Sequence, residues 1–194
     1  MLRLTTGLLS VVMFVFLSGG VHAESGSVEV EGVELPRTLS VDGYELVFNG
    51  AGERRRWMMS VYVSALYLVE PSSDAEAILE SDDPRAITLH ITSGLINRER
   101  MMDSIEQGFD AATGGDTSSI QAPIDALVSS FGDEIEDGDT IELLYLPERG
   151  VVVRHNDEEV GEVEGEPEFR EALFAIWLGD DPASDDLRSA MLGR

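Results

Sequence analysis

The chain has 194 residues, no cysteine and 43% hydrophobic residues, which is enough for one compact domain with a packed core. Thirteen basic residues against 38 acidic ones give a formal net charge of −25. A field of this sign repels nucleic acid and anionic lipid headgroups, so neither is expected as a general partner, and the lack of cysteine excludes disulfides and thiol chemistry.

The first 23 residues have the three parts of a secretory signal. Arg3 supplies a positive start, residues 8–17 form an apolar run, and Val21-His22-Ala23 is a small-residue cleavage site. The apolar run is shorter than the roughly 20 residues that span a bilayer. We therefore expect cleavage after Ala23, a periplasmic or secreted protein without a stable membrane anchor, and a single domain over residues 24–194.

β-Branched and aromatic residues predict strands in the first half of the mature chain. We expect an edge strand within residues 24–36, a strand at 44–48 and a long strand from Trp57 to Val69. The glycines of Asn49-Gly50-Ala51-Gly52 predict a tight reversal between the last two. The odd positions of the long strand are nearly all apolar, so that face packs in the core. The opposite face can line a cavity with the residues Met58, Ser60, Tyr62 and Ser64.

The second half of the chain groups its helices and strands. Helices are predicted from Asp74 to Leu79, after the N-cap residue Asn97, and over 122–131, 169–177 and 184–192; strands are predicted over 86–92, 140–146, 151–155 and 159–163. Hairpin-linked strands with grouped helices do not alternate as βαβ units do. The expected fold class is α+β, with an antiparallel sheet covered on one face by helices.

Two blocks of the sequence resemble chalcone isomerase-like proteins. The first is Asn49-Gly50-Ala51-Gly52-Glu53-Arg54, followed by the strand segment 61–68, and the second runs from Gly138-Asp139 to Ile176-Trp177-Leu178-Gly179. The resemblance implies an open-faced sheet packed against helices with a ligand cleft between them. It also implies two kinds of relative, namely plant enzymes that close a flavanone ring and proteins that bind fatty acids without catalysis.

The resemblance assigns site residues one at a time. Arg54 matches the arginine of the motif, and Tyr62 stands where the plant enzymes carry a catalytic threonine. Ile96 and Asp103 stand where those enzymes have a tyrosine and an asparagine, so two polar roles are lost and chalcone isomerisation is in doubt. Arg54 and Tyr62 are the candidate catalytic residues if the protein is an enzyme.

The run Arg54-Arg55-Arg56 is a concentration of positive charge in a very acidic chain. A guanidinium is a natural fork for a carboxylate, so we predict ligand binding by Arg54, Arg56, Tyr62 and Ser64. The alternative is that the arginines pair with surface carboxylates and that Tyr62 packs under a helix. On one straight strand Arg56 and Tyr62 would lie about 20 Å apart, so a small carboxylate could not touch both.

The sequence gives little support to a metal site or to a serine nucleophile. His90 and His155 have no second histidine at metal-ligand spacing, and the serines lie outside any Gly-x-Ser-x-Gly setting. We expect no metal and no cofactor.

Three hypotheses for function follow. The first is an exported binding protein for a fatty acid or another small amphiphilic carboxylate. The second is an isomerase, an intramolecular lyase acting on a phenolic or enone substrate. The third is an interaction module of the cell envelope whose cleft is filled by its own side chains. The ligand and the oligomeric state are left open.

Overall fold

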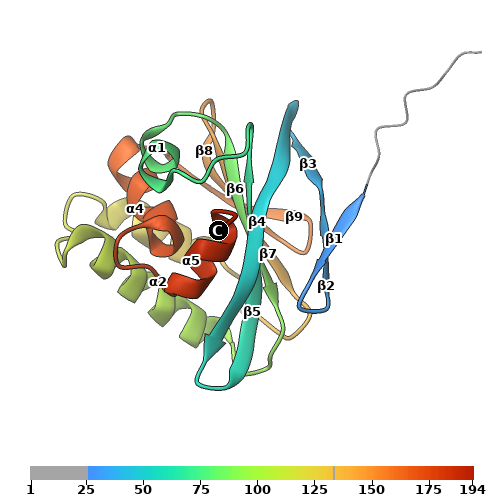
Figure 1. Cartoon of the computed structure of the whole chain (residues 1–194). Coiled ribbons are helices and arrows are strands. Elements are labelled where there is room, and N and C mark those ends of the chain that lie inside the picture. Colours follow the sequence, from blue (N-terminus) through green and yellow to red (C-terminus); the bar gives the residue numbers. More distant parts are fainter. Residues whose placement is uncertain (1–25, 133) are drawn as a thin grey trace, which may run out of the picture.

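Residues 26–132 and 134–194 form two layers in the computed structural model, a curled antiparallel sheet and a layer of helices (Figure 1). The expected signal peptide, residues 1–23, lies outside these described residues. Within them, no helix has both the length and the hydropathy needed to cross a membrane.

The strands follow one another as a meander. They are β1 (Ser27–Val30), β2 (Val33–Pro36), β3 (Thr38–Val41), β4 (Tyr44–Arg56), β5 (Met59–Leu68), β6 (Arg85–Ile91), β7 (Thr140–Leu146), β8 (Gly150–His155) and β9 (Glu158–Val163). Strands β3 to β9 form one seven-stranded sheet in sequence order, with every neighbouring pair antiparallel, whereas β1 and β2 form a separate hairpin. The predicted antiparallel sheet is confirmed, and β3 is a strand that the sequence did not indicate.

The helices are α1 (Ala75–Glu80), α2 (Arg98–Thr113), α3 (Gln121–Ser130), α4 (Pro167–Leu178) and α5 (Asp185–Met191). Three of them begin at capping side chains. Asp74, Asn97 and Ser184 each accept a hydrogen bond from a backbone N–H three residues further on. All five helices lie on the same side of the sheet, and the β1–β2 hairpin lies on the other side (Figure 1). The α+β class with helices on one face is therefore confirmed.

The two faces of the sheet bury separate hydrophobic cores. The larger core joins residues such as Leu66 and Leu89 to the helices, where the rings of Phe109 and Phe169 stack with centroids 5.7 Å apart. The smaller core lies on the opposite face and includes the fully buried Leu35 of β2. Both faces of the central strands are thus covered, which explains why almost every residue of β5, β6 and β7 is buried.

The predicted reversal at residues 49–52 is wrong, because these residues lie inside the 13-residue strand β4. The chain instead turns at Trp57 and Met58, which connect Arg56 to Met59. Gly50 and Gly52 serve packing rather than turning. A Cβ atom on Gly50 would stand 2.2 Å from the carbonyl oxygen of Ala190, and one on Gly52 would stand 2.7 Å from the Ala190 Cβ. Helix α5 therefore lies directly on the backbone of β4.

Candidate functional site

A cavity of about 700 Å³ lies between the β4–β5 hairpin, helix α2 and the end of α4. This volume is within the range of about 300–1,000 Å³ typical of small-molecule sites. The cavity is lined by apolar side chains, which include Val61, Ile96, Met101, Ile105 and Ile176. A small number of polar and charged groups interrupt this lining.

The hairpin brings together two of the predicted site residues. Because the chain reverses at Trp57 and Met58, Arg54 of β4 pairs directly with Tyr62 of β5. The straight strand that would hold Arg56 and Tyr62 far apart is therefore not formed, because the chain turns between them. Arg54, Arg56 and Tyr62 all line the same cavity.

A β-bulge at Val61 determines which residues of β5 face the cavity. Arg54 pairs with Tyr62 but Arg55 pairs with Ser60, so Val61 is an extra residue on β5. The bulge moves Met59 to the side of Tyr62, and Met59 and Val61 line the cavity.

The predicted cavity face of this strand was therefore wrong for three of its four members, Met58, Ser60 and Ser64, none of which lines the cavity. The hydroxyls of Ser60 and Thr92 are 2.6 Å apart, within hydrogen-bonding distance. Ser64 is fully buried, and its hydroxyl has no hydrogen-bond partner among the residues that the structure describes. For Met58 and Ser60, extrapolating strict alternation through the bulge caused the error, since one extra residue reverses the face of the residues before it. Ser64 follows the bulge and keeps the face of Tyr62, but it is fully buried and does not line the cavity.

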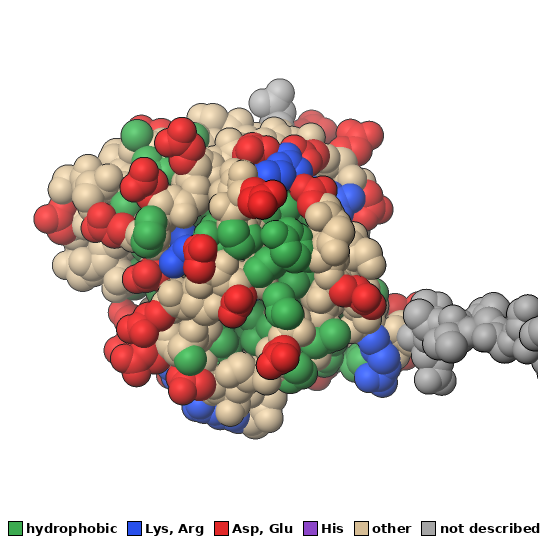
Figure 2. All heavy atoms as spheres, turned by 90° about the horizontal axis from the view of Figure 1, so that it is seen from above, with side chains coloured by type: hydrophobic (Ala, Val, Ile, Leu, Met, Phe, Trp, Pro, Cys, Tyr) green, Lys and Arg blue, Asp and Glu red, His purple; other side chains and the backbone are tan. Residues whose placement is uncertain are grey.

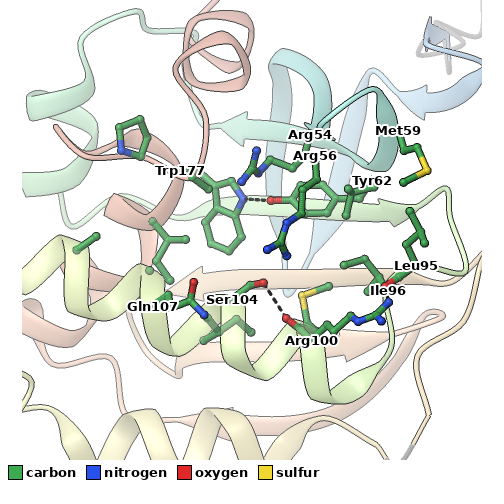
Figure 3. A pocket seen from close by; sticks show the side chains of 18 of the residues that line it. Arg54, Arg56, Met59, Tyr62, Leu95, Ile96, Arg100, Ser104, Gln107 and Trp177 are labelled. Carbon is green, nitrogen blue, oxygen red and sulfur yellow. Dashed lines mark hydrogen bonds between the residues drawn. The ribbon is translucent and has the colours of Figure 1, made fainter.

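The phenol of Tyr62 is fixed by Trp177 of α4. The indole Nε1–H donates to the Tyr62 hydroxyl at 3.1 Å, and both side chains are buried (Figure 3). Burial raises the pKa of Tyr62, and the Trp177 N–H and the Arg54 guanidinium lower it by less. The phenol therefore stays neutral at neutral pH. Its oxygen accepts from Trp177, which leaves its own O–H free to donate to a ligand.

Helix α2 supplies polar groups that the sequence reading missed. Arg100, Ser104 and Gln107 line the cavity across from Arg54 and Arg56, with the Trp177 ring between the two sides (Figure 3). The Arg100 Nη1 donates to the Leu95 carbonyl at 2.5 Å. The sequence did contain a signal for this face of the helix. Residues 100, 104 and 107 are spaced by four and three, which places their polar side chains on one stripe beside the apolar stripe.

The charged lining is mainly positive. Arg54, Arg56 and Arg100 contribute guanidinium groups, and Asp181 contributes a carboxylate. Across residues 26–132 and 134–194, none of these three arginines lies within 4.0 Å of a carboxylate oxygen, whereas their neighbour Arg55 pairs with Glu53 at 3.1 Å. Three unpaired cations around an apolar hollow can hold an anionic head group while its apolar part is buried.

The resemblance also singled out Ile96 and Asp103, and the structure places them differently. Ile96 lines the cavity, whereas Asp103 is exposed on another side of α2. In the described part of the chain, no group of three histidine, aspartate or glutamate side chains could hold a metal ion.

Comparison with known proteins places this geometry in a family. The family model described as chalcone isomerase-like matches residues 27–193. The chain belongs to the chalcone isomerase-like family. Among solved structures, this chalcone isomerase-like chain is similar to a fatty-acid binding protein of Arabidopsis thaliana, with 19% identity and a TM-score of 0.69. The match covers 86% of this chain and 96% of the plant protein, so the two share a fold. No curated protein sequence matches the chain.

In this chalcone isomerase-like protein, the glycine segment that carries the resemblance holds the C-terminus beside the site. The Asn49 amide nitrogen donates to the carbonyls of Ser72 and Met191 at 2.9 and 2.8 Å, and its oxygen accepts from the Ser72 N–H. The segment thus fixes α5 on β4 five residues before Arg54. Its role is to support the strand that carries the cationic side of the cavity.

Proposed function

We propose that this protein binds a small amphiphilic carboxylate, such as a fatty acid, without transforming it. The observation that carries the proposal is the cavity of about 700 Å³ in which Arg54, Arg56 and Arg100 stand beside apolar walls without a carboxylate partner in the described chain. The fatty-acid binding of the structurally similar plant protein supports it. An interaction module whose cleft is filled by its own side chains does not fit an open cavity of this size.

Within the site, the head group and the chain of the ligand have separate places. The carboxylate accepts hydrogen bonds from the Arg54 guanidinium and from the free O–H of Tyr62. These two residues lie side by side on the neighbouring strands β4 and β5. The hydrocarbon chain lies along Met101, Ile105 and Ile176 between sheet and helices. Export, as expected from the first 23 residues, would place this binding activity outside the cytoplasm.

Direct titration tests the proposal. Delipidated protein is titrated with a long-chain fatty acid and, separately, with the alcohol of the same chain length, which lacks the carboxylate. We expect saturable binding of the acid and weaker binding of the alcohol. Arg54→Gln should weaken binding of the acid about 10- to 100-fold, because a hydrogen bond to a charged group contributes roughly 1.5–3 kcal/mol.

The neighbouring arginine provides the matched control. Arg55 pairs with Glu53 and does not line the cavity, so Arg55→Gln should leave acid binding unchanged. The proposal fails if no long-chain carboxylate binds saturably, or if the two substitutions weaken binding equally.

A further inference from the structure

The tip of the β4–β5 hairpin, residues 54–59, carries the three most exposed large hydrophobic side chains of the described chain. Trp57 is 92% exposed, Met58 is 90% exposed and Met59 is 52% exposed. Single exposed hydrophobic residues are ordinary, but three consecutive ones at the end of a long hairpin form a patch. Since Trp57 and Met59 also line the cavity, this patch lies at the cavity mouth.

The backbone of the tip holds the tryptophan outward at a conformational cost. Trp57 and Met58 form a two-residue turn, and Trp57 has a φ of 64°. Glycine is the usual residue at such a position, and a bulky side chain there is an outlier. A glycine would relieve the strain but would remove the exposed ring, so the sequence keeps an aromatic group in solvent where packing does not require it.

The same tip carries three arginines in a row, Arg54, Arg55 and Arg56. On the face that Figure 2 shows, acidic side chains are more common than basic ones. A guanidinium binds phosphate through two parallel hydrogen bonds, and its aliphatic stem can lie along an apolar phase. Tryptophan is enriched where proteins meet the headgroup region of a bilayer. The combination of exposed tryptophan, methionines and arginines therefore matches a phospholipid surface.

The repulsion due to the net charge of −25 is largely screened at physiological salt. Charges are screened over about 8 Å at that ionic strength, and the 13 residues of β4 place its far end about 40 Å from the tip. The lipid headgroups would feel the tip arginines, together with two carboxylates, Glu53, which pairs with Arg55, and Asp181 of the cavity lining. A second copy of the chain is a poorer partner, because a contact between two tips would bring their arginines together.

We infer that the hairpin tip docks reversibly on a bilayer surface that carries anionic phospholipids, with the cavity mouth facing the headgroups. On this inference, the tip is a local exception to the repulsion of anionic headgroups that the net charge predicts. The composition of the tip is independent of what the cavity binds. Transfer of an amphiphile from the bilayer into the cavity rests on the proposed function.

The two tryptophans of the chain make the test direct, because Trp57 is exposed and Trp177 is 3% exposed. Full-length protein is mixed with vesicles of equimolar phosphatidylcholine and phosphatidylglycerol. We expect Trp57 emission to shift to shorter wavelength and to be quenched by brominated lipid, with a smaller response on phosphatidylcholine alone. Residues 1–25 contain no tryptophan and are identical in all variants.

Two substitutions test the tip without touching the cavity lining. Arg55→Gln should lower the partition coefficient about fivefold, since one arginine near an anionic surface contributes about 1 kcal/mol. Met58→Ser should lower it severalfold by removing an inserted apolar group. Arg37→Gln and Val160→Ser, which change an exposed arginine and an exposed valine on other strands or turns, should leave vesicle binding unchanged.

Three results would contradict the inference. It is overturned if the emission of Trp57 does not respond to anionic vesicles, or if the tip variants and the control variants partition equally. It is also overturned if the tip substitutions instead dissociate a dimer formed without lipid. Because Arg55 and Met58 do not line the cavity, fatty-acid titration of the same variants shows separately whether the proposed function stands.

Discussion

Tyr62 is the residue at which the hairpin, the helix layer and the cavity meet. Its hydroxyl accepts from the buried Trp177 N–H, and Arg54 lies across the strand pair. The Trp177 N–H depends on this one acceptor, since burial removes water as an alternative. The bond therefore fixes the end of α4 against β5 and orients the phenol at the same time.

Removal of the Tyr62 hydroxyl should destabilise the protein through Trp177. We expect Tyr62→Phe to lower the free energy of unfolding by about 1–3 kcal/mol, because it leaves a buried donor without a partner. In a Trp177→Phe background the same substitution should cost less, and a double-mutant cycle followed by urea denaturation measures the difference. Tyr44→Phe is the control, since the Tyr44 hydroxyl forms no hydrogen bond to residues 26–132 or 134–194. Equal costs in the two backgrounds would show that the bond contributes nothing.

At the scale of elements, the sequence predicted the features that depend on neighbouring residues, but not those that depend on contacts between distant segments. The helix starts at Asp74 and Asn97 could be predicted, because a capping side chain and its N–H partner lie three residues apart. The reversal at Trp57 could not, because neither it nor Met58 is a typical turn residue. Asn49-Gly50 imitates a turn, yet its glycine is needed for a helix 140 residues further along the chain.

The candidate site shows the same division between local and distant information. The resemblance indicated Arg54 and Tyr62, and both line the cavity. The bulge at Val61 depends on how two strands pair, so alternation along β5 alone placed Ser60 on the wrong face. Arg100 and Ser104 could have been read from helical spacing, but only the packed structure shows that their stripe faces the hairpin.

Contact between α5 and β4 can be tested at Gly50. Its φ is not positive, so Gly50→Ala acts through space alone, and the new Cβ would collide with the carbonyl oxygens of Ala190 and Met191. We expect a loss of about 1–3 kcal/mol in the free energy of unfolding, with faster hydrogen exchange in α5. Gly94→Ala has open space around it and should be nearly neutral. Unchanged exchange in α5 would show that the helix does not depend on this close approach.

At the scale of the whole molecule, the curl of the sheet brings its two edges close together, and a cluster of ion pairs joins them. Arg149, in the turn between β7 and β8, donates to Asp42 of the β3–β4 turn at 2.8 Å and to Glu162 of β9 at 3.0 Å. It also bonds Glu159, and these hydrogen bonds raise the pKa of Arg149. One guanidinium thus holds together three carboxylates that would otherwise repel one another in an already acidic protein.

Substitution of Arg149 should change how stability depends on salt. Arg149→Gln leaves Asp42, Glu159 and Glu162 facing one another without a cation, so the variant should melt at a lower temperature than the wild type in dilute buffer. Added sodium chloride weakens the attraction in the wild type and the repulsion in the variant, so the difference in melting temperature should shrink. Repulsion among the other carboxylates is common to both proteins and cancels in this difference. Arg37→Gln removes the same charge from another exposed arginine and should show a small difference at all salt concentrations. A difference for Arg149→Gln that stays constant with salt would mean that the arginine acts through packing, and the curl would then be held by the sheet alone.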